Sequence, residues 1–555
     1  MNLGIDLGST YTILSTYRED HGMLEPLEAD TKNNVSIPSV ISVNKKGIIN
    51  YGSYAKGQTG KRNIQTYKAF KMLLMEADKE LVKERGYDEK HSPKWALTEF
   101  LDCIISNAQL SDNSSGTKSK IEHLVVGAPN IWFHKFDTLG GRAVLKDICT
   151  GIEGVEDVRI VSEPVLASAY FAYNYQKVRK EPFNGNILIV DYGGGTLDLS
   201  LTKIDKSRDK SMEIKMLAFN GAGENTDHCI GNAGIVYHES LMEHILRKNN
   251  PEAADRLLGT EEFFAAVNKL EEVMLMPQTN KDIQRIFDMV GTDFPQELEE
   301  EVLREIVECD GEEYEITCKD LLDVYNDKIR NVFEEKMDEM IRMAKEEGID
   351  PFHAFGNKFR IALVGGFGNF YLVRNQMRKK FRFSSQDDRE KDIIEKEADR
   401  ERAISYGAAL ISSGIIGICN TAPYTVGIRS VRDGKYEIDY MVRYKDEIEI
   451  DKIYWIEKLF GLEGDSLQDD FVIESNNKPI LIALKDKYQK KLADEFRVNE
   501  NGGMKAFTIG ISFNNSEFMT LHIKPFLFLE QRKSDREITI ELGELYDAFE
   551  EKKEV

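Results

Sequence analysis

Two widely separated stretches of the chain share one pattern of apolar and polar positions. In the central stretch, the apolar run Ile187–Val190 predicts a buried strand that ends at Asp191. Gly193–Gly195 then form a turn, and the alternating positions Thr196–Leu201 predict a second strand. The pattern therefore predicts a β-hairpin with a carboxylate at the end of its first strand.

The N-terminal stretch Leu3–Leu14 repeats the same order of residue types. An apolar strand is followed by Asp6, one apolar residue, Gly8, small or hydroxyl-bearing residues and a second strand. Two such hairpins far apart in the sequence predict a duplicated fold. In that fold, two lobes would each present a turn and a carboxylate to a single cleft.

The composition of the central turn predicts an anion site. Three consecutive glycines leave backbone N–H groups open to a close-approaching anion, for which phosphate is the usual candidate. Asp191 can hold a Mg²⁺ ion through its waters, and Thr196 offers a hydroxyl to a phosphate oxygen. The alternative is a tight glycine-rich hairpin without a ligand, and the second copy of the pattern favours the phosphate site.

Two further segments carry charged candidates. Residues 61–110 are predicted to be helical, and Lys68 and Lys71 lie three apart, so they are expected on one helix face. A solvated helix face is the alternative for both lysines. Glu163 follows a predicted strand and begins a helix rich in small residues, so it serves either the helix cap or a reaction.

A third glycine-rich turn follows the predicted strand Phe359–Val364. Gly365–Gly368 connect this strand to a helix that begins near Tyr371. A glycine-rich turn that leads into a helix N-terminus is typical of an anion or nucleotide site.

The pattern changes near Gly417 from mixed helices and strands to short alternating strands. The whole chain is therefore expected to be of the α/β class, with two or more domains. We expect a domain with a duplicated βα core over residues 1–415, a short linker over 416–422, and a small β-sandwich-like domain over 423–555.

Charge and cysteine content narrow the function classes. The formal net charge of −23 argues against a nucleic-acid partner. The six cysteines show no Cys-x-x-Cys spacing, which favours reduced thiols in a cytoplasmic protein. No signal peptide and no apolar run of membrane-spanning length is recognised, so no membrane partner is expected.

Several motifs occur in a characteristic order and resemble those of the heat-shock protein 70 chaperones, within the wider actin and sugar-kinase ATPase superfamily. They are Asp6-Leu7-Gly8-Ser9-Thr10-Tyr11, Ser162-Glu163-Pro164, Asp191-Tyr192-Gly193-Gly194-Gly195-Thr196-Leu197-Asp198 and Val364-Gly365-Gly366. The resemblance covers roughly residues 1–415 well and the remainder weakly. It implies a two-lobed actin-like ATPase domain.

The resemblance also implies roles for the matching residues. Asp6 and Asp191 would orient waters around Mg²⁺, Lys71 would stabilise the transferring phosphoryl group, and Glu163 would position the attacking water. Thr196 would join these residues in catalysis. The residues implied to bind ATP or ADP are Gly8, Ser9, Thr10, Tyr11, Gly193, Gly194, Gly195, Thr196, Gly223, Glu224, Glu272, Gly365, Gly366 and Phe367.

The chain departs from the family pattern in three places. Glu271-Glu272 stand where a Lys-Arg pair of the adenine-clamping helix is expected. The Leu-rich, Asp-ended interdomain linker is absent, and Gly414–Ala422 occupies its place. The chain also shows no helical lid after the β domain.

The resemblance implies a chaperone-like ATPase of low turnover that couples nucleotide state to binding of extended apolar polypeptide. A J-domain co-chaperone and a nucleotide exchange factor would be its partners. The alternatives are a scaffold that binds nucleotide without hydrolysis, which Glu271-Glu272 would suit, and a small-molecule kinase on the same superfamily fold.

Overall fold

The computed structural model divides into two compact units, Met1–Ile131 with Ile148–Gly417, and Trp132–Asp147 with Ile418–Val555. It describes residues 1–76, 78–111, 117–134, 141–206, 212–222, 232–290, 302–352, 359–381, 397–463, 466–467, 470–475, 478–500, 506–527, 532–543 and 548–551. The sequence did not indicate that Trp132–Asp147 would group with the second unit.

The first large sheet of the first unit has the order β3-β2-β1-β8-β9, with β4 paired to β2. Its strands are β1 (Asn2–Leu7), β2 (Tyr11–Arg18), β3 (Met23–Pro26), β4 (Ser36–Pro38), β8 (Ile121–Ala128) and β9 (Val155–Ser162). Strand β1 pairs antiparallel with β2 and parallel with β8. Leu3, Ile5 and Leu7 are fully buried, as expected for a central strand covered on both faces.

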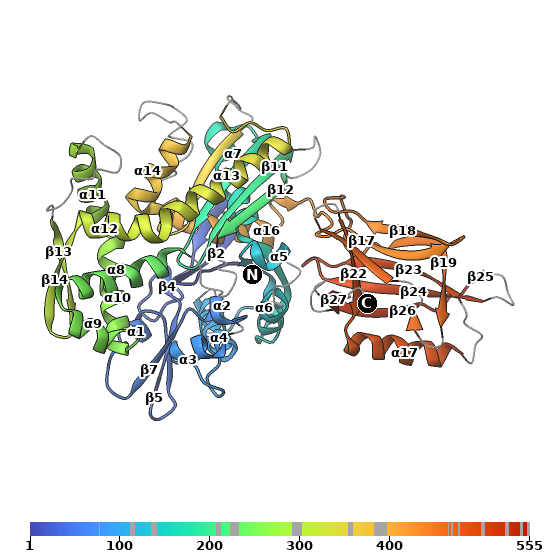
Figure 1. The fold of residues 1–555 in the computed structure, drawn as a ribbon, viewed down its shortest axis with the longest axis horizontal. Coiled ribbons are helices and arrows are strands. Elements are labelled where there is room, and N and C mark those ends of the chain that lie inside the picture. Colours follow the sequence, from blue (N-terminus) through green and yellow to red (C-terminus); the bar gives the residue numbers. More distant parts are fainter. Residues whose placement is uncertain are drawn as a thin grey trace. The chain divides into compact units, whose positions relative to one another are not determined.

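The second large sheet repeats this arrangement with β10 (Gly185–Tyr192), β11 (Leu197–Lys206), β12 (Met212–Ala222) and β15 (Phe359–Val364). Strand β10 pairs antiparallel with β11 and parallel with β15, as β1 does with β2 and β8. Both predicted hairpins are therefore present, and the predicted α/β class with a duplicated core is confirmed (Figure 1).

Two long helices cover these sheets. Helix α7 (Glu163–Arg179) contacts strands of both sheets, and α16 (Glu397–Ser412) packs on β1, β2 and α7. The packing is backbone to backbone, because a Cβ on Gly4 would overlap the backbone at Ala408–Ala409 and a Cβ on Gly407 would overlap Leu166. The small residues that the sequence shows in both helices are needed for this close approach.

The remaining elements of the first unit surround these sheets. The strands form the sheets β6-β5-β7 and β13-β14, and helix α13 lies along β11 and β12 (Figure 1). The elements are β5 (Val40–Asn44), β6 (Ile49–Tyr51), β7 (Ile64–Lys68), β13 (Val302–Cys309), β14 (Glu312–Thr317), α1 (Gly52–Lys56), α2 (Phe70–Leu73), α3 (Lys79–Glu84), α4 (Pro93–Ser111), α8 (Gly234–Asn249), α9 (Pro251–Leu257), α10 (Glu261–Leu275), α11 (Pro277–Val290), α12 (Cys318–Tyr325), η1 (Asn326–Arg330), α13 (Asn331–Glu346), η2 (Phe367–Asn369) and α14 (Tyr371–Lys380). Helices α5 (Ile131–His134) and α6 (Gly141–Thr150) extend across the division between the units.

The expectation that Lys68 and Lys71 share a helix face is wrong. Lys68 ends strand β7, and Lys71 lies in α2, which begins at Phe70. Between them, Ala69 has φ of +54°, a left-handed conformation that interrupts both elements. The two lysines consequently have different partners.

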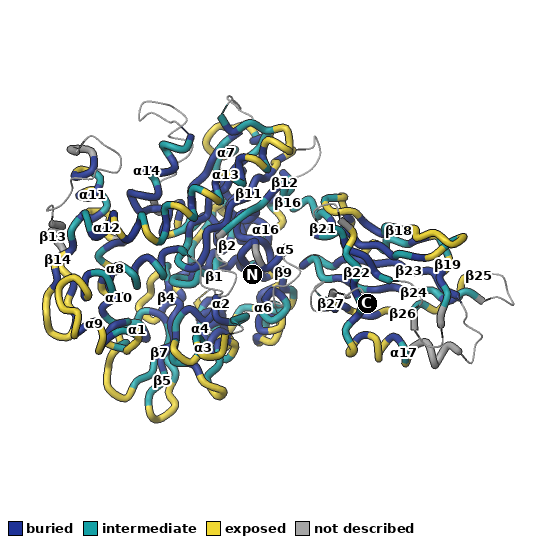
Figure 2. The backbone as a smooth tube through the Cα atoms, in the orientation of Figure 1, coloured by how far each residue is buried: buried dark blue, intermediate teal, exposed yellow. Residues whose placement is uncertain are grey.

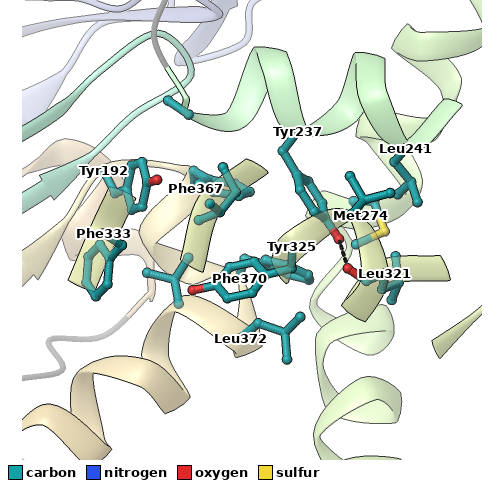
Figure 3. Close-up of a cluster of buried hydrophobic side chains, with 14 of the residues drawn as sticks. Tyr192, Tyr237, Leu241, Met274, Leu321, Tyr325, Phe333, Phe367, Phe370 and Leu372 are labelled. Carbon is teal, nitrogen blue, oxygen red and sulfur yellow. Dashed lines mark hydrogen bonds between the residues drawn. The ribbon is translucent and has the colours of Figure 1, made fainter. Parts of the chain in front are cut away.

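An aromatic cluster fixes the third glycine-rich turn against the end of β10 (Figure 3). The ring of Tyr192 stacks on Phe333 with centroids 5.6 Å apart and meets Phe367 edge-on at 5.0 Å. Tyr237 donates a hydrogen bond of 3.1 Å to the carbonyl of Leu321, which satisfies its buried hydroxyl. This packing holds η2, and with it Phe367, at a defined place beside Asp191.

The second unit contains two antiparallel sheets, β18-β17-β21-β22-β27 and β20-β19-β23-β24-β25, with β26 paired to β24. The residues of β23 are buried throughout, and buried and exposed residues alternate along β26 (Figure 2). The strands are β17 (Val426–Arg432), β18 (Lys435–Val442), β19 (Tyr454–Glu463), β20 (Ser466–Leu467), β21 (Asp470–Ser475), β22 (Lys478–Leu484), β23 (Ala506–Phe513), β24 (Met519–Leu527), β25 (Arg532–Lys533), β26 (Ile538–Gly543) and β27 (Phe549–Glu551).

A helix in this unit, α17 (Asp486–Glu500), was not predicted. Among its described side chains, Tyr488 and Leu492 are the buried apolar ones, four residues apart, so its apolar stripe is narrow. Within the described part of the whole chain, none of the helices has the length and apolar character needed to cross a bilayer.

Candidate functional site

The turns of the two hairpins converge on one cavity of about 200 Å³ in the first unit. A Cβ on Gly195 would come within 2.6 Å of Ser9 Oγ, and a Cβ on Gly194 would overlap the hydroxyl of Thr10. Only glycine therefore allows the second turn to lie against the first. The sequence pattern predicted this juxtaposition of two turns at one cleft.

Some backbone groups of the central turn are already hydrogen-bonded within the protein. Gly193 donates its N–H to the carbonyl of Thr196 at 3.0 Å, so it is not open to an anion as the sequence suggested. The start of helix α8 packs against this turn, where Ile235 donates its N–H to the carbonyl of Gly194 at 2.7 Å. The N–H groups of Gly194 and Gly195 remain as candidates for binding phosphate.

Replacing Gly194 by alanine is expected to lower the free energy of unfolding by about 1–3 kcal/mol, because the new methyl group overlaps Thr10. Thermal and urea unfolding measure this loss. Gly57→Ala is the matched control, since Gly57 has φ of −70° and a Cβ there would stay at least 3.5 Å from other atoms. Equal stabilities of the two variants would contradict the close approach of the turns.

Acidic side chains gather at one end of the cavity. Asp6 and Asp191 come from equivalent ends of β1 and β10, and Asp198 lies opposite Asp191 in the β10–β11 register. Burial, together with the charge of Glu163, raises the pKa of Asp6 to about 8 and that of Asp198 to about 7. The same two causes raise the pKa of Asp191 well above its ordinary value.

Lys71 supplies a positive charge to this end of the cavity. Its Nζ lies 2.5 Å from Oε1 of Glu163, and both side chains are buried. The hydroxyl of Ser162, at the N-cap position, bonds to Asn130 and does not cap α7. The side chain of Glu163, the first residue of α7, pairs with Lys71, so its contacts are not those of a simple helix cap.

The donor set at this end fits a hydrated divalent cation. The carboxyl groups of Asp6, Glu163 and Asp191 outnumber the one lysine at this end, and the pKa values of Asp6 and Asp191 are raised, so a bound cation would favour the ionised forms of these groups. Asp198 accepts hydrogen bonds from the N–H of Asn130, at 2.9 Å, and from the side chain of Thr196, and it does not itself line the cavity. No set of three or more Asp, Glu, His or Cys side chains within the described ranges is arranged to hold a metal ion directly.

The third glycine-rich turn also lines the cavity, next to Asp191. Gly365 has φ of +83°, and a Cβ there would lie 2.5 Å from Asp191 Oδ1, so glycine is required at this position. A Cβ on Gly366 would meet no atom within 4 Å, which places open space beside it. Gly366 and Phe367 both line the cavity.

The structure brings most of the predicted site residues together around this cavity. The predicted residues that line it are Asp6, Gly8, Ser9, Thr10, Tyr11, Lys71, Glu163, Asp191, Gly193, Gly194, Gly195, Thr196, Gly365, Gly366 and Phe367. Glu272 does not line it, and its side chain is 59% exposed. Gly223 and Glu224 lie outside the described residues.

The Glu271-Glu272 pair has a partner that the sequence did not reveal. Lys56 Nζ lies 3.3 Å from Glu271 and 3.4 Å from Glu272, and it donates a hydrogen bond of 2.8 Å to the hydroxyl of Tyr11. Burial alone would lower the pKa of Lys56, but Glu271 and Tyr11 hold it above its ordinary value. The negative charge on α10 is therefore compensated within the protein.

A neighbouring cavity of about 160 Å³ shares Ser9, Thr10 and Glu271 with the first. Lys68 lies in it and donates to Asn268 Oδ1 at 2.7 Å, and burial lowers the pKa of Lys68 to about 8. Lys68 thus belongs to a different environment from Lys71.

Two residues of the site were not singled out from the sequence. Asp198 belongs to the motif around Asp191, but the sequence assigned it no role. Its position opposite Asp191 could have been inferred from the pairing of the two hairpin strands. His238 lines both cavities from α8, and burial lowers its pKa, so the imidazole is neutral at pH 7. No motif in the sequence marks His238.

The chain is similar to known proteins over much of its length. A family model described as "Hsp70 protein" matches residues 2–308. Heat shock 70 kDa protein 2 of Paracoccidioides lutzii is 23% identical over 461 residues, which cover 77% of this chain and 61% of that protein. The family model matches more than half of the residues of this chain, so the chain belongs to the Hsp70 family.

Proposed function

We propose that this protein binds ATP and hydrolyses it slowly, and that its nucleotide state controls binding of extended apolar polypeptide. The observation that carries the proposal is the convergence of two glycine-containing hairpin turns, Asp6, Asp191 and the Lys71–Glu163 pair on one cavity. Membership of the Hsp70 family supports a nucleotide-binding, chaperone-type function.

The two turns would hold the phosphates of the nucleotide. The N–H groups of Gly194 and Gly195 present positive dipoles to an anion, and the hydroxyls of Ser9, Thr10 and Thr196 can donate to phosphate oxygens. Because the protein has a net charge of −23, binding of a polyanion relies on these local groups.

Lys71 and Glu163 would act on the phosphoryl group and the attacking water. Lys71 has three N–H donors and donates one of them to Glu163. The other two can stabilise charge on the transferring phosphoryl group. Glu163 keeps a second carboxylate oxygen, which can accept a hydrogen bond from the attacking water. Catalysis would then depend on positioning and electrostatic stabilisation, without a covalent intermediate.

Asp6 and Asp191 would hold the hydrated Mg²⁺ that accompanies the nucleotide. The ion would supply positive charge next to the phosphates. The raised pKa values of Asp6 and Asp191 support this assignment, because they belong to buried carboxyl groups that a nearby positive charge would ionise.

Steady-state ATP hydrolysis tests the enzymatic part of the proposal. The wild-type chain is expected to release phosphate slowly from ATP in the presence of Mg²⁺, and Asp191→Asn is expected to lose most of this activity while remaining folded. Circular dichroism and thermal unfolding verify the fold of the variant. Equal phosphate release by both proteins would indicate a contaminating ATPase and would remove the metal role of Asp191.

The second unit offers a place for an extended peptide. Strand β18 is the outermost strand of its sheet in the described part of the chain, and an edge strand can pair with an added strand. Val431 and Tyr436 lie opposite each other in the β17–β18 register and are 61% and 71% exposed. This exposed apolar pair supports an apolar peptide as the ligand.

Fluorescence anisotropy of a labelled apolar peptide tests the chaperone part. Because the usual linker is absent, we expect weak peptide binding that changes less than tenfold between ATP and ADP, at the lower end of allosteric coupling of roughly 1–3 kcal/mol. A larger difference would show that the altered linker still couples the two activities. No peptide binding in either state would favour a nucleotide-dependent scaffold.

A further inference from the structure

The cavity of about 160 Å³ beside the proposed nucleotide site has a lysine in its wall that no carboxylate of the protein contacts. Lys68, the last residue of β7, lines this cavity and is half-buried. Its Nζ donates to Asn268 Oδ1 at 2.7 Å and lies 5.6 Å from the centroid of the Phe264 ring, and both of these residues line the same cavity. Within the described part of the chain, Lys68 forms no ion pair with an acidic side chain.

The other cations that line this cavity are already paired. Arg85 donates two hydrogen bonds to the carboxylate of Glu239, one of them at 2.9 Å, and Lys56 Nζ lies 3.3 Å from Glu271. His238 carries no positive charge at pH 7, because burial lowers its pKa. The ammonium group on β7 is therefore the one cation among the described lining residues that lacks a contacting counter-charge.

The remaining acidic residues of the wall do not neutralise this ammonium group. Glu261 accepts hydrogen bonds from Thr66 at 2.9 Å and from Gln65 at 3.2 Å, and Glu84 is exposed at the end of α3. Burial lowers the pKa of Lys68 to about 8, although the charges of the surrounding glutamates act in the opposite direction. An anion in direct contact would offset the cost of burying this charge.

The rest of the wall is largely apolar and suits a small organic molecule. It includes Phe264 and Val267 of α10, Val40 of β5 and Ile235 of α8. The volume of about 160 Å³ is close to the roughly 150 Å³ in which a protein interior can hold a benzene ring. An apolar pocket with a few convergent polar groups is the usual form of a small-molecule site.

We infer that this cavity binds a small organic monocarboxylate, with the carboxylate on Lys68 and an aromatic or branched apolar body against Phe264 and Val267. Lys68 has three N–H donors and gives one to Asn268, so two remain for the ligand. One uncompensated cation matches a single negative charge, whereas a dianion such as phosphate would bring a second charge among the glutamates. This site is separate from the proposed nucleotide site and does not depend on it.

Isothermal titration calorimetry of the full chain without nucleotide tests the inference, with benzoate as the probe and benzyl alcohol as the uncharged ligand with the same ring. Benzoate is expected to bind more tightly than benzyl alcohol. Lys68→Met should weaken benzoate by about 10- to 100-fold, the loss expected for hydrogen bonds to a charged group, and should leave benzyl alcohol unchanged. Lys83→Met is the matched control and should retain benzoate binding, because Lys83 is exposed and pairs with Glu80 outside the cavity.

The pH dependence of benzoate binding is a second test, which needs only the wild-type protein. Benzoate stays ionised throughout, and its affinity should fall above about pH 8, by up to tenfold per pH unit, because the ammonium group of Lys68 loses its proton there. Lys68→Met should show no such fall.

Three results would overturn the inference and leave the proposed ATP site untouched. They are the absence of benzoate binding, benzoate binding that Lys68→Met does not weaken, and wild-type affinity that is constant between pH 7 and pH 9. Inorganic phosphate is the control for charge. Phosphate binding that Lys68→Met abolishes would overturn the monocarboxylate class of ligand.

Discussion

Replacing Lys71 by alanine is expected to lower the turnover number for ATP by about 10²- to 10³-fold, with a much smaller effect on nucleotide affinity. The lysine would stabilise charge that develops in the transition state, and removing one such contact typically costs this much. Single-turnover hydrolysis and nucleotide titration, measured on the same preparation, separate the two effects.

The same substitution leaves Glu163 as a buried charge without its partner, which costs about 3–5 kcal/mol of stability. The double variant Lys71→Ala with Glu163→Gln should recover much of that stability without recovering turnover. Lys68→Ala is the matched control, because Lys68 bonds to Asn268 in the neighbouring cavity. A similar loss of turnover in both single variants would mean that the effect is structural and not specific to Lys71.

The substitution Glu163→Gln is expected to reduce turnover by about 10²-fold or more while preserving nucleotide binding. Glutamine keeps the shape of the side chain and can still accept a hydrogen bond from Lys71, but it is a poorer acceptor for the attacking water. Pre-steady-state measurement of phosphate release gives the rate of the chemical step.

Glu261→Gln is a suitable control for this variant. Glu261 accepts a hydrogen bond of 2.9 Å from Thr66 and lines the neighbouring cavity, so it shares the acidic character of Glu163 but not its position. Turnover by Glu163→Gln at the wild-type rate would exclude Glu163 from positioning the water.

The core of the fold could be predicted because its signals are local. Each hairpin places two strands and a turn in one continuous stretch, Asn2–Arg18 or Gly185–Lys206, so the pattern that specifies it is present in the sequence around Asp6 or Asp191. Helix α17 could not be predicted in the same way, because only Tyr488 and Leu492 of its described residues form an apolar stripe. The position of Lys68 was mispredicted because the left-handed conformation of Ala69 leaves no sequence pattern.

The site was predictable where its residues lie on those hairpins. Contacts between distant segments could not be predicted. Glu271 lies 215 residues from Lys56 in the sequence, and no periodicity links them. His238 is a single residue of α8 whose place beside the site appears only when the distant turns converge on the cavity. Its identification requires knowledge of which segments meet there, which a single sequence does not contain.

The packing of α16 on β1 has a consequence for synthesis of the chain on the ribosome. The helix follows β1 by about 390 residues, and at roughly 5–20 residues per second it emerges about 20–80 s later. During that interval, the face of β1 that α16 covers lacks its native neighbour, and Gly4 offers no side chain to shield the strand. The first unit of this Hsp70-family protein therefore completes its own fold only late in translation, and its nascent chain is a candidate for protection by chaperones.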